Sequence, residues 1–438
     1  MSSSMQIIEY PDKREWEKLL ARPRKDTPSL EAGVKKILLE VKQNGDRAVD
    51  KYSLKFDNVD LPEKLVTEAE WNGAEQELTE PLKAAIRQAK KNIERFHSKQ
   101  SVPEEVMETM PGIRCWRKSV PIEKVGLYIP GGTAPLFSTV LMLAIPAMIA
   151  GCREILLCSP PGKDGKLHPA ILYAASVAGV RKIYKVGGVQ AIAAMAYGTE
   201  TMMRVDKIFG PGNQYVTCAK QLLQQEGVAI DMPAGPSELA VYADDTAVPG
   251  FVAADLLSQC EHGSDSQVIL VAANKKIVEQ VIRKMEAQVS VLPRKDIALK
   301  ALQHSKAIII SDPAVAMELL NTYAPEHLML SCKNAEDLAL KVRHAGSVFI
   351  GNFAPETAGD YASGTNHTLP TNGYARAYSG VSVDSFIKKI SFQQISEKGL
   401  SEISDTLIEM ARAEGLQAHA AAVEIRLGQM KNNSHARH

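Results

Sequence analysis

Gln259 and His262 are two residues whose types and spacing could bind a metal ion. They lie in the stretch 255–263 (DLLSQCEHG), whose apolar spacing predicts a helix that ends at Gly263. Residues three apart leave the same face of a helix, so an imidazole and an amide oxygen would converge at its end. Imidazole is a strong zinc ligand and an amide oxygen a weak one. A histidine near a helix C-terminus also interacts favourably with the helix dipole, so the pattern leaves both interpretations open.

Glu326 and His327 are a second candidate pair, in the stretch APEHL that follows a predicted helix. Adjacent residues on a loop can both face one pocket. There a carboxylate could activate water while an imidazole transfers protons. Surface polarity after a proline turn is the alternative.

Asp360, Glu414 and His419 complete the polar candidates. Asp360 lies in a long polar loop, 351–371, and loops of this length inside compact domains are usually functional or disordered. The flanking apolar strands favour an ordered loop with Asp360 as a hard ligand. Glu414 and His419 would be about 140° apart around a continuous helix and would not share a face. Either Gly415 breaks the helix or the two residues approach one site from different sides, and a surface histidine is the default for His419.

Composition limits the class of protein. The 438 residues exceed the size of one hydrophobic core, so we expect two or more domains. The 51 basic and 51 acidic residues cancel, which argues against nucleic acid or an anionic membrane as a partner. The N-terminus resembles no signal peptide, and the longest apolar run, 140–150, contains Pro146 and predicts a buried helix. The six scattered cysteines fit reduced thiols, so we expect a cytoplasmic protein.

Two α/β series must position these residues. After a helical region from Asp12 to about Gln100, four strands are each followed by a turn and a helix, and three of the turns are rich in glycine, namely those at Gly131-Gly132, Gly187-Gly188 and 210–213. The predicted strands are 125–130, 154–158, 183–186 and 207–209. This order predicts a doubly wound parallel sheet with its ligands at the carboxyl ends of the strands. The glycine turns suit phosphates, but no GxGxxG follows a strand, so plain tight turns remain an equal alternative.

The second series begins after the loop 232–237. Its predicted strands are 239–242, 267–271, 307–311 and 347–350. Two successive series suggest two similar domains. From Ile395 onward only helix is predicted, and such a tail is too small for its own core and would pack on a neighbour.

Together these stretches resemble the histidinol dehydrogenase family, which carries out the last two steps of histidine biosynthesis. The likeness extends from about Asp12 to Lys431. It is carried by VGLYIPGGTAPLFSTVLMLAIPA, DKIFGPGNQYVT, IDMPAGPSE, DLLSQCEHGSDSQVIL, APEHL and AGSVFIGNFAPETAGDYASGTNHTLPT. Six motifs in the order of the family make the resemblance specific.

The resemblance implies the roles of individual residues. The implied zinc ligands are Gln259, His262, Asp360 and His419. The implied substrate contacts are Ser237, Gln259, His262, His327, Asp360, Glu414 and His419. The implied bases are Glu326 and His327, and the implied NAD contacts are Tyr128, Gln190 and Asn213.

The resemblance also implies two Rossmann-like doubly wound parallel-sheet domains with a helical N-terminal region and a small helical C-terminal dimerisation tail. We expect an N-terminal arm at 1–23, a metal and substrate domain at 24–126 and 237–380, an NAD domain at 127–236 and the tail at 381–438. The implied homodimer has shared active sites: the tail of each subunit contributes its Glu414 and His419 to the active site of the partner. That arrangement would explain their awkward spacing.

The implied reaction is the four-electron oxidation of L-histidinol to L-histidine through L-histidinaldehyde, with two NAD reduced and one zinc ion per subunit. His327 would remove the alcohol proton, and Glu326 would activate water. A zinc hydrolase with Glu326 as base and no nicotinamide is the main alternative, and a silent nucleotide-binding module is another. Cys260 would point about 100° away from the metal face of the helix, which favours a buried core thiol over a catalytic one.

Overall fold

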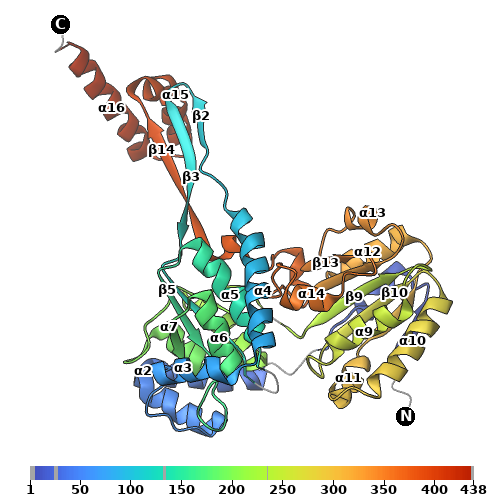
Figure 1. Cartoon of the computed structure of the whole chain (residues 1–438). Helices are drawn as coiled ribbons and strands as arrows, with labels where there is room; N and C mark the ends of the chain where they lie inside the picture. Colours follow the sequence, from blue (N-terminus) through green and yellow to red (C-terminus); the bar gives the residue numbers. More distant parts are fainter. Residues whose placement is uncertain (1–4, 24–27, 132–134, 234, 436–438) are drawn as a thin grey trace. The chain divides into compact units, whose positions relative to one another are not determined.

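The computed structural model describes residues 5–23, 28–131, 135–233 and 235–435 (Figure 1). Gly132, half of one predicted glycine turn, lies outside these ranges. The chain divides into two compact units: Met1–Gln100 with Ile122–Phe386, and Ser101–Pro121 with Ile387–His438. None of the helices within the described ranges is both long and apolar enough to cross a membrane.

The first unit contains a five-stranded parallel sheet. Its order is β6(Lys182–Tyr184), β5(Glu154–Cys158), β4(Lys124–Tyr128), β7(Lys207–Phe209) and β8(Ala229–Ile230). Alternate residues of β4, β5, β6 and β7 enter two different cores. Val125 and Leu127 pack with α5(Phe137–Ala150) and α6(Pro169–Ala178). Tyr128 and Leu156 pack with α7(Gly188–Tyr197) and α8(Gln214–Gln225). Both faces are therefore covered by helices, as the alternating series predicted.

The N-terminal helices pack against this sheet's helices. They are α2(Pro28–Asp57), which contacts α7 and α8, α3(Glu68–Glu77), which contacts α6, and α4(Glu80–His97), which runs along α5 (Figure 1). We expected 24–126 to associate with 237–380. The apolar stripe of α2, which includes Val34 and Val41, is instead buried in the core with α7 and α8. Strand β4 also crosses the expected boundary at residue 126.

A six-stranded parallel sheet follows. Its order is β1(Gln6–Glu9), β11(Lys306–Ile309), β10(Gln267–Ala272), β9(Glu238–Ala243), β12(His327–Ser331) and β13(Ser347–Ile350). Apart from β1, its strands follow the same relative order as the five-stranded sheet. The helices on its two faces are α9(Pro249–Cys260), α10(Lys275–Val289) and α11(Lys295–Leu302) on one, and α1(Trp16–Leu19), α12(Pro313–Tyr323) and α13(Ala335–Ala339) on the other. The prediction of parallel α/β sheets is confirmed, although β1, β8 and β12 were not predicted.

The predicted polar loop 351–371 is ordered and contains a short helix, α14(Glu356–Tyr361). Side-chain hydrogen bonds attach it to the helices of the five-stranded sheet. Asn92 Nδ2 donates to Ala362 O at 2.7 Å, and Asn366 Nδ2 donates to Met142 O at 2.6 Å. Single-turn 3₁₀ helices complete the unit at Lys13–Glu15, Ser98–Gln100, Tyr374–Arg376 and Val383–Phe386.

The second unit is built from two segments that lie far apart in the sequence. Strands β14(Ile387–Ile395), β3(Ile113–Pro121) and β2(Val106–Met110) form an antiparallel sheet in that order. Helices α15(Glu397–Ala413) and α16(Gln417–His435) follow β14, as the helical pattern after Ile395 predicted. The expected tail 381–438 is not wholly helical, because it also contains β14, and residues 381–386 belong to the first unit. The antiparallel sheet was not predicted. The small buried cluster of the helices contains Ile408, Ala411 and Ala420.

Gly210 ends β7 in a conformation that requires glycine. Its φ is +127°, and a Cβ at this position would lie 2.1 Å from Tyr128 O. Gly227 also has a positive φ, +88°, but a Cβ there would meet no atom within 4 Å. We expect Gly210→Ala to lower the free energy of unfolding by about 3 kcal/mol, and Gly227→Ala by about 1 kcal/mol, because only the first adds a clash to the backbone strain. Urea titrations of both variants measure the difference, and equal losses would contradict the steric argument.

Candidate active site

The candidate catalytic residues lie at the amino edge of the six-stranded sheet. His327 is the first residue of β12 and Glu326 precedes it, so the predicted loop is in fact the start of a buried strand. Ser237 directly precedes β9, the neighbour of β12. Helix α9 follows β9, and its C-terminal turn carries Gln259. We predicted ligands at the carboxyl ends for the first sheet, and this cluster uses the opposite edge of the second.

His327 is oriented by a backbone carbonyl. Its Nδ1 lies 3.2 Å from Glu238 O, and because a carbonyl only accepts, Nδ1 carries the proton. Nε2 therefore presents its lone pair, 3.8 Å from Asp360 Oδ1. Burial lowers the pKa of His327 to about 4, so the ring is neutral at pH 7 and able to accept a proton.

Glu326 is held beside His327. Its Oε2 accepts a hydrogen bond from the Glu238 N–H at 2.8 Å and lies 3.7 Å from His327 Nδ1. Burial raises the pKa of Glu326 well above its usual value, and the nearby carboxylates of Glu238, Asp360 and Glu356 act in the same direction. The pair can therefore serve as two neighbouring acid–base groups.

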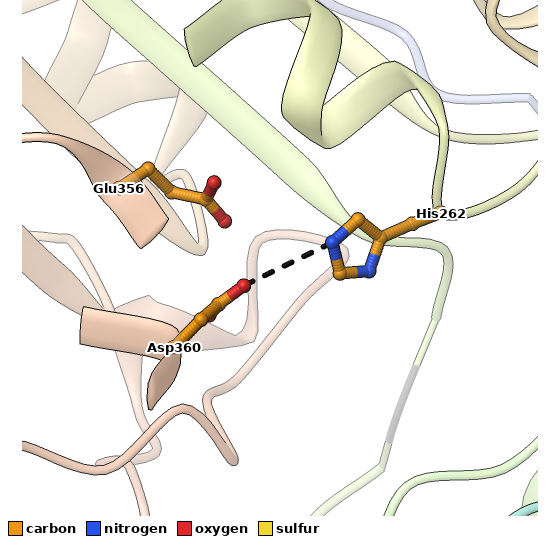
Figure 2. A group of neighbouring side chains, drawn as sticks. All are labelled: His262, Glu356 and Asp360. Carbon is orange, nitrogen blue, oxygen red and sulfur yellow. Dashed lines mark ion pairs between the residues drawn. The ribbon is translucent and has the colours of Figure 1, made fainter. Parts of the chain in front are cut away.

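His262, Glu356 and Asp360 point toward one another (Figure 2). One potential ligand atom of each lies within 4.8 Å of the other two, and His262 Nε2 is 3.8 Å from Asp360 Oδ2. Glu356 Oε2 accepts a hydrogen bond from Ser258 Oγ at 2.9 Å, whereas Oε1 is buried without a hydrogen-bond partner in the described part of the chain. Burial raises the pKa of Glu356.

Gln259 belongs to the last turn of α9. We predicted that the helix continues to Gly263, but it ends at Cys260, and His262 lies in the turn beyond, with its N–H donating to Gln259 O at 3.3 Å. The side chain of Gln259 is fully buried, and neither of its polar atoms has a partner among residues 5–23, 28–131, 135–233 and 235–435. Cys260 is buried in the apolar core beside α9, which confirms the structural interpretation of this thiol.

This donor set fits a divalent metal ion. A buried amide without a partner costs about 1–3 kcal/mol, which a ligand would recover. Burial is the largest cause of the raised pKa values of Glu326 and Glu356, and the nearby charge of Asp360 raises the pKa of both further. A cation beside these carboxylates would offset that repulsion. An imidazole, an amide oxygen and a carboxylate together suit zinc.

Glu414 and His419 belong to the second unit, whereas the residues described above belong to the first. Glu414 caps the C-terminus of α15, and His419 lies in the first turn of α16. Gly415 between them has φ +75°, so the helix is broken there, which was one of the two alternatives. Both side chains are exposed.

Tyr128, Gln190 and Asn213 all line one cavity of about 1420 Å³ at the carboxyl edge of the five-stranded sheet. Tyr128 Oη accepts a hydrogen bond from the Gly188 N–H at 3.0 Å, and burial raises the pKa of Tyr128 to about 12. Gln190 Oε1 is buried without a partner within the described ranges. Asn213 Oδ1 caps the N-terminus of α8. The cavity is large enough for a dinucleotide and lies at the predicted edge.

Glu356 and His367 were not predicted as site residues from the sequence. Glu356 lies four residues before the predicted Asp360, and recognising a helix there would have placed both on one face. His367 left no such signal. Its Nδ1 donates to Asp360 O at 2.8 Å and its Nε2 lies 3.1 Å from Thr139 Oγ1, so the ring ties the loop that carries Asp360 to α5.

Comparison with known proteins agrees with this geometry. The family model for histidinol dehydrogenase matches residues 20–427. The histidinol dehydrogenase of Bacteroides fragilis is 58% identical over 427 residues, which are 98% of this chain and 100% of that protein. That of Salmonella typhimurium is 49% identical over 419 residues, 95% of this chain and 96% of the other.

A solved structure is similar over the whole chain as well. The crystal structure of histidinol dehydrogenase from Elizabethkingia anophelis matches with a TM-score of 0.96 and 52% identity, covering 98% of this chain and 99% of that one. A model match over most of the chain and relatives of this identity show the family. The chain therefore belongs to the histidinol dehydrogenase family, oxidoreductases of histidine biosynthesis.

Proposed function

We propose that this chain oxidises L-histidinol to L-histidine through L-histidinaldehyde, with two NAD reduced and one zinc ion per subunit. Family membership supports the reaction. The observation that carries the proposal is the state of His327, a buried neutral imidazole whose free Nε2 faces Asp360. A base in this state is ready to take the proton of an alcohol.

The proposed metal ligands are Gln259, His262 and Asp360 of one chain and His419 of the partner subunit. When bound, zinc would hold the imidazole and amine of the substrate and so fix the position of the reacting carbon. Two further substrate contacts are proposed: Ser237 of the same chain and Glu414 of the partner subunit. The unpartnered amide of Gln259 and the approach of His262 to Asp360 support this assignment.

In the proposed first oxidation, His327 Nε2 removes the hydroxyl proton while hydride leaves the substrate carbon. The Glu238 carbonyl accepts from Nδ1–H and would stabilise the imidazolium that forms. In the second oxidation Glu326 takes a proton from water as its oxygen attacks the aldehyde carbon and forms the hydrate. His327, which has released its first proton to solvent, then takes a hydroxyl proton of the hydrate while the second hydride leaves the same carbon. The 3.7 Å between Glu326 Oε2 and His327 Nδ1 supports consecutive roles in one site.

NAD, when bound, would accept the hydride, and its proposed contacts are Tyr128, Gln190 and Asn213. The shared cavity and the unpartnered Gln190 Oε1 support them. On this proposal the five-stranded sheet is the NAD side and the six-stranded sheet the metal and substrate side. The glycine turns at the carboxyl edge then hold the dinucleotide.

We also propose a homodimer with shared active sites. The second unit exposes large apolar side chains, which favours a protein interface there. They include Met107, Phe392, Met410, Leu416 and Ile425. Exposed Glu414 and His419 on either side of Gly415 are free to enter a partner's site.

The activity is tested by mixing the purified chain with L-histidinol and NAD and following the absorbance of reduced nicotinamide. We expect His327→Ala to lower kcat by roughly two to four orders of magnitude, because it removes the base. His304→Ala is the control, because His304 is an exposed histidine beside the same six-stranded sheet. The activity of this variant should be unchanged. No change in this absorbance with the unsubstituted chain would instead favour the hydrolase alternative.

Metal binding is tested separately from turnover. Asp360→Asn should weaken zinc binding by roughly a hundredfold or more, because loss of a ligand costs at least as much as loss of a supporting group. Asp245→Asn, an exposed aspartate at the carboxyl edge of the same sheet, is the matched control and should bind zinc normally. Zinc content after dialysis and titration against a coloured chelator measure both, and equal affinities would remove Asp360 from the ligand set.

Shared sites predict complementation between two inactive variants. When His327→Ala and His419→Ala chains exchange subunits at equal amounts, half of the dimers are mixed and each holds one intact site. Roughly a quarter of the wild-type activity should return. Native mass spectrometry verifies the mixed dimers, and their inactivity would place the whole site within one chain.

A further inference from the structure

Glu238, the first residue of β9, contacts both proposed bases through its backbone. Its N–H donates to Glu326 Oε2 at 2.8 Å, and its carbonyl accepts from His327 Nδ1 at 3.2 Å. The position of this one residue therefore sets the orientation of the carboxylate and the tautomer of the imidazole. Whatever holds Glu238 also holds the two bases.

The side chain of Glu238 is held by Arg22 from the N-terminal arm. Arg22 Nε donates to Oε1 at 2.5 Å and Nη2 donates to Oε2 at 2.8 Å, a two-point contact with the carboxylate. The Asn372 N–H adds a third hydrogen bond to Oε1 at 2.7 Å. The side chains of Glu238 and Arg22 are only 2% and 14% exposed, so water does not compete strongly for this pair.

Arg22 also holds the turn that leads into Glu326. Its Nη2 donates to Tyr323 O at 2.7 Å, and its guanidinium lies 4.1 Å from the centre of the Tyr323 ring. The next residue, Ala324, has φ +53°, an unfavourable backbone for alanine that neighbouring contacts must maintain. Pro325 separates this residue from Glu326.

Gln267 closes the arrangement. Tyr323 Oη donates to Gln267 Oε1 at 2.9 Å, and Gln267 Nε2 donates to Ala21 O at 3.2 Å, which is the residue before Arg22. The arm, β10 and the turn before β12 are thus joined by hydrogen bonds. Among these hydrogen-bonded groups, the Arg22 guanidinium is the one that contacts both the Glu238 carboxylate and the Tyr323 carbonyl.

We propose that Arg22 is a positioning residue for the reaction: by binding the Glu238 carboxylate and the Tyr323 carbonyl together, it holds Glu326 and His327 in their reactive geometry. The inference rests on the proposed function of these two bases. Only arginine offers a planar fork that can bind a carboxylate at two points and still donate to a carbonyl, so lysine is expected to replace it poorly.

The test compares Arg22→Met, Arg22→Lys and the control Arg376→Met. Arg376 donates to Thr322 O, one residue before Tyr323, but is exposed and makes no hydrogen bond to Glu238 in the described chain. We expect Arg22→Met to lower kcat by roughly ten- to a hundredfold, as small displacements of catalytic groups do, with the KM of histidinol and of NAD within about twofold. The zinc content of Arg22→Met should be unchanged. The kcat of Arg22→Lys should lie between those of Arg22→Met and the unsubstituted chain, and the kcat of Arg376→Met should be normal.

Two further measurements separate positioning from a loss of folding. Added guanidinium ion at millimolar concentration should restore part of the kcat of Arg22→Gly. In addition, Arg22→Met combined with Glu238→Gln should lower kcat no further than the more damaging single substitution, because both remove the same contact. Absence of rescue together with multiplying losses would overturn the proposal, as would a fall in kcat for Arg376→Met equal to that for Arg22→Met.

A measurement without turnover distinguishes failure of this inference from failure of the proposed function. The measurement is the NMR spectrum of ¹⁵N-histidine-labelled protein, in which the His327 signals are assigned by their loss in His327→Ala. These signals should show a ring protonated at Nδ1. The balance of tautomers should change in Arg22→Met and stay the same in Arg376→Met. An inactive wild type with this shift would refute the proposed function and leave the positioning role intact. An active wild type whose His327 signals ignore Arg22 would refute the positioning role alone.

Discussion

Buried negative charge is the constraint around which the active site is arranged. Glu238, Glu326 and Glu356 are all buried at the amino edge of one sheet, and Asp360 lies near two of them. Arg22 neutralises Glu238. Glu356 and Asp360 approach His262, which is the place where we propose that a metal ion binds. A cation there would satisfy the charge and the unpartnered amide at once.

The pairing of β9 with β12 turns this chemistry into a fixed geometry. The two strands run in parallel with His327 opposite Leu239, so the preceding residue, Glu238, is within reach of both Glu326 and His327. Residues 88 and 89 positions apart in the sequence thus share one hydrogen-bonded unit. Strands surrounded by packed side chains hold such groups more precisely than loops do.

Much of the fold could be predicted from the alternation of apolar strands, turns and helices, since eight strands of the two parallel sheets were expected from that pattern. Strand β12 was missed because its first residue is a histidine preceded by proline and glutamate, which on a short segment resembles a turn. The second unit was missed in part because β3 and β14 pair across more than 250 residues, and no local pattern encodes a pairing of that range. The polar candidates were found as residue types, but their meeting depends on such long-range contacts. Arg22 carried no signal at all, since a lone arginine near the N-terminus is normally solvated.

The two sheets share a strand order but present opposite edges to their proposed ligands, and the two edges attract charges of opposite sign. In a parallel α/β sheet the helices run back against the strands, so their N-termini gather at the carboxyl edge and their C-termini at the amino edge. The former carry partial positive charge and the latter partial negative charge. The cavity beside the start of α7 and α8 thus favours phosphates, and the end of α9 favours a cation. One architecture used in both polarities can receive an anionic carrier and a metal ion without any change of topology.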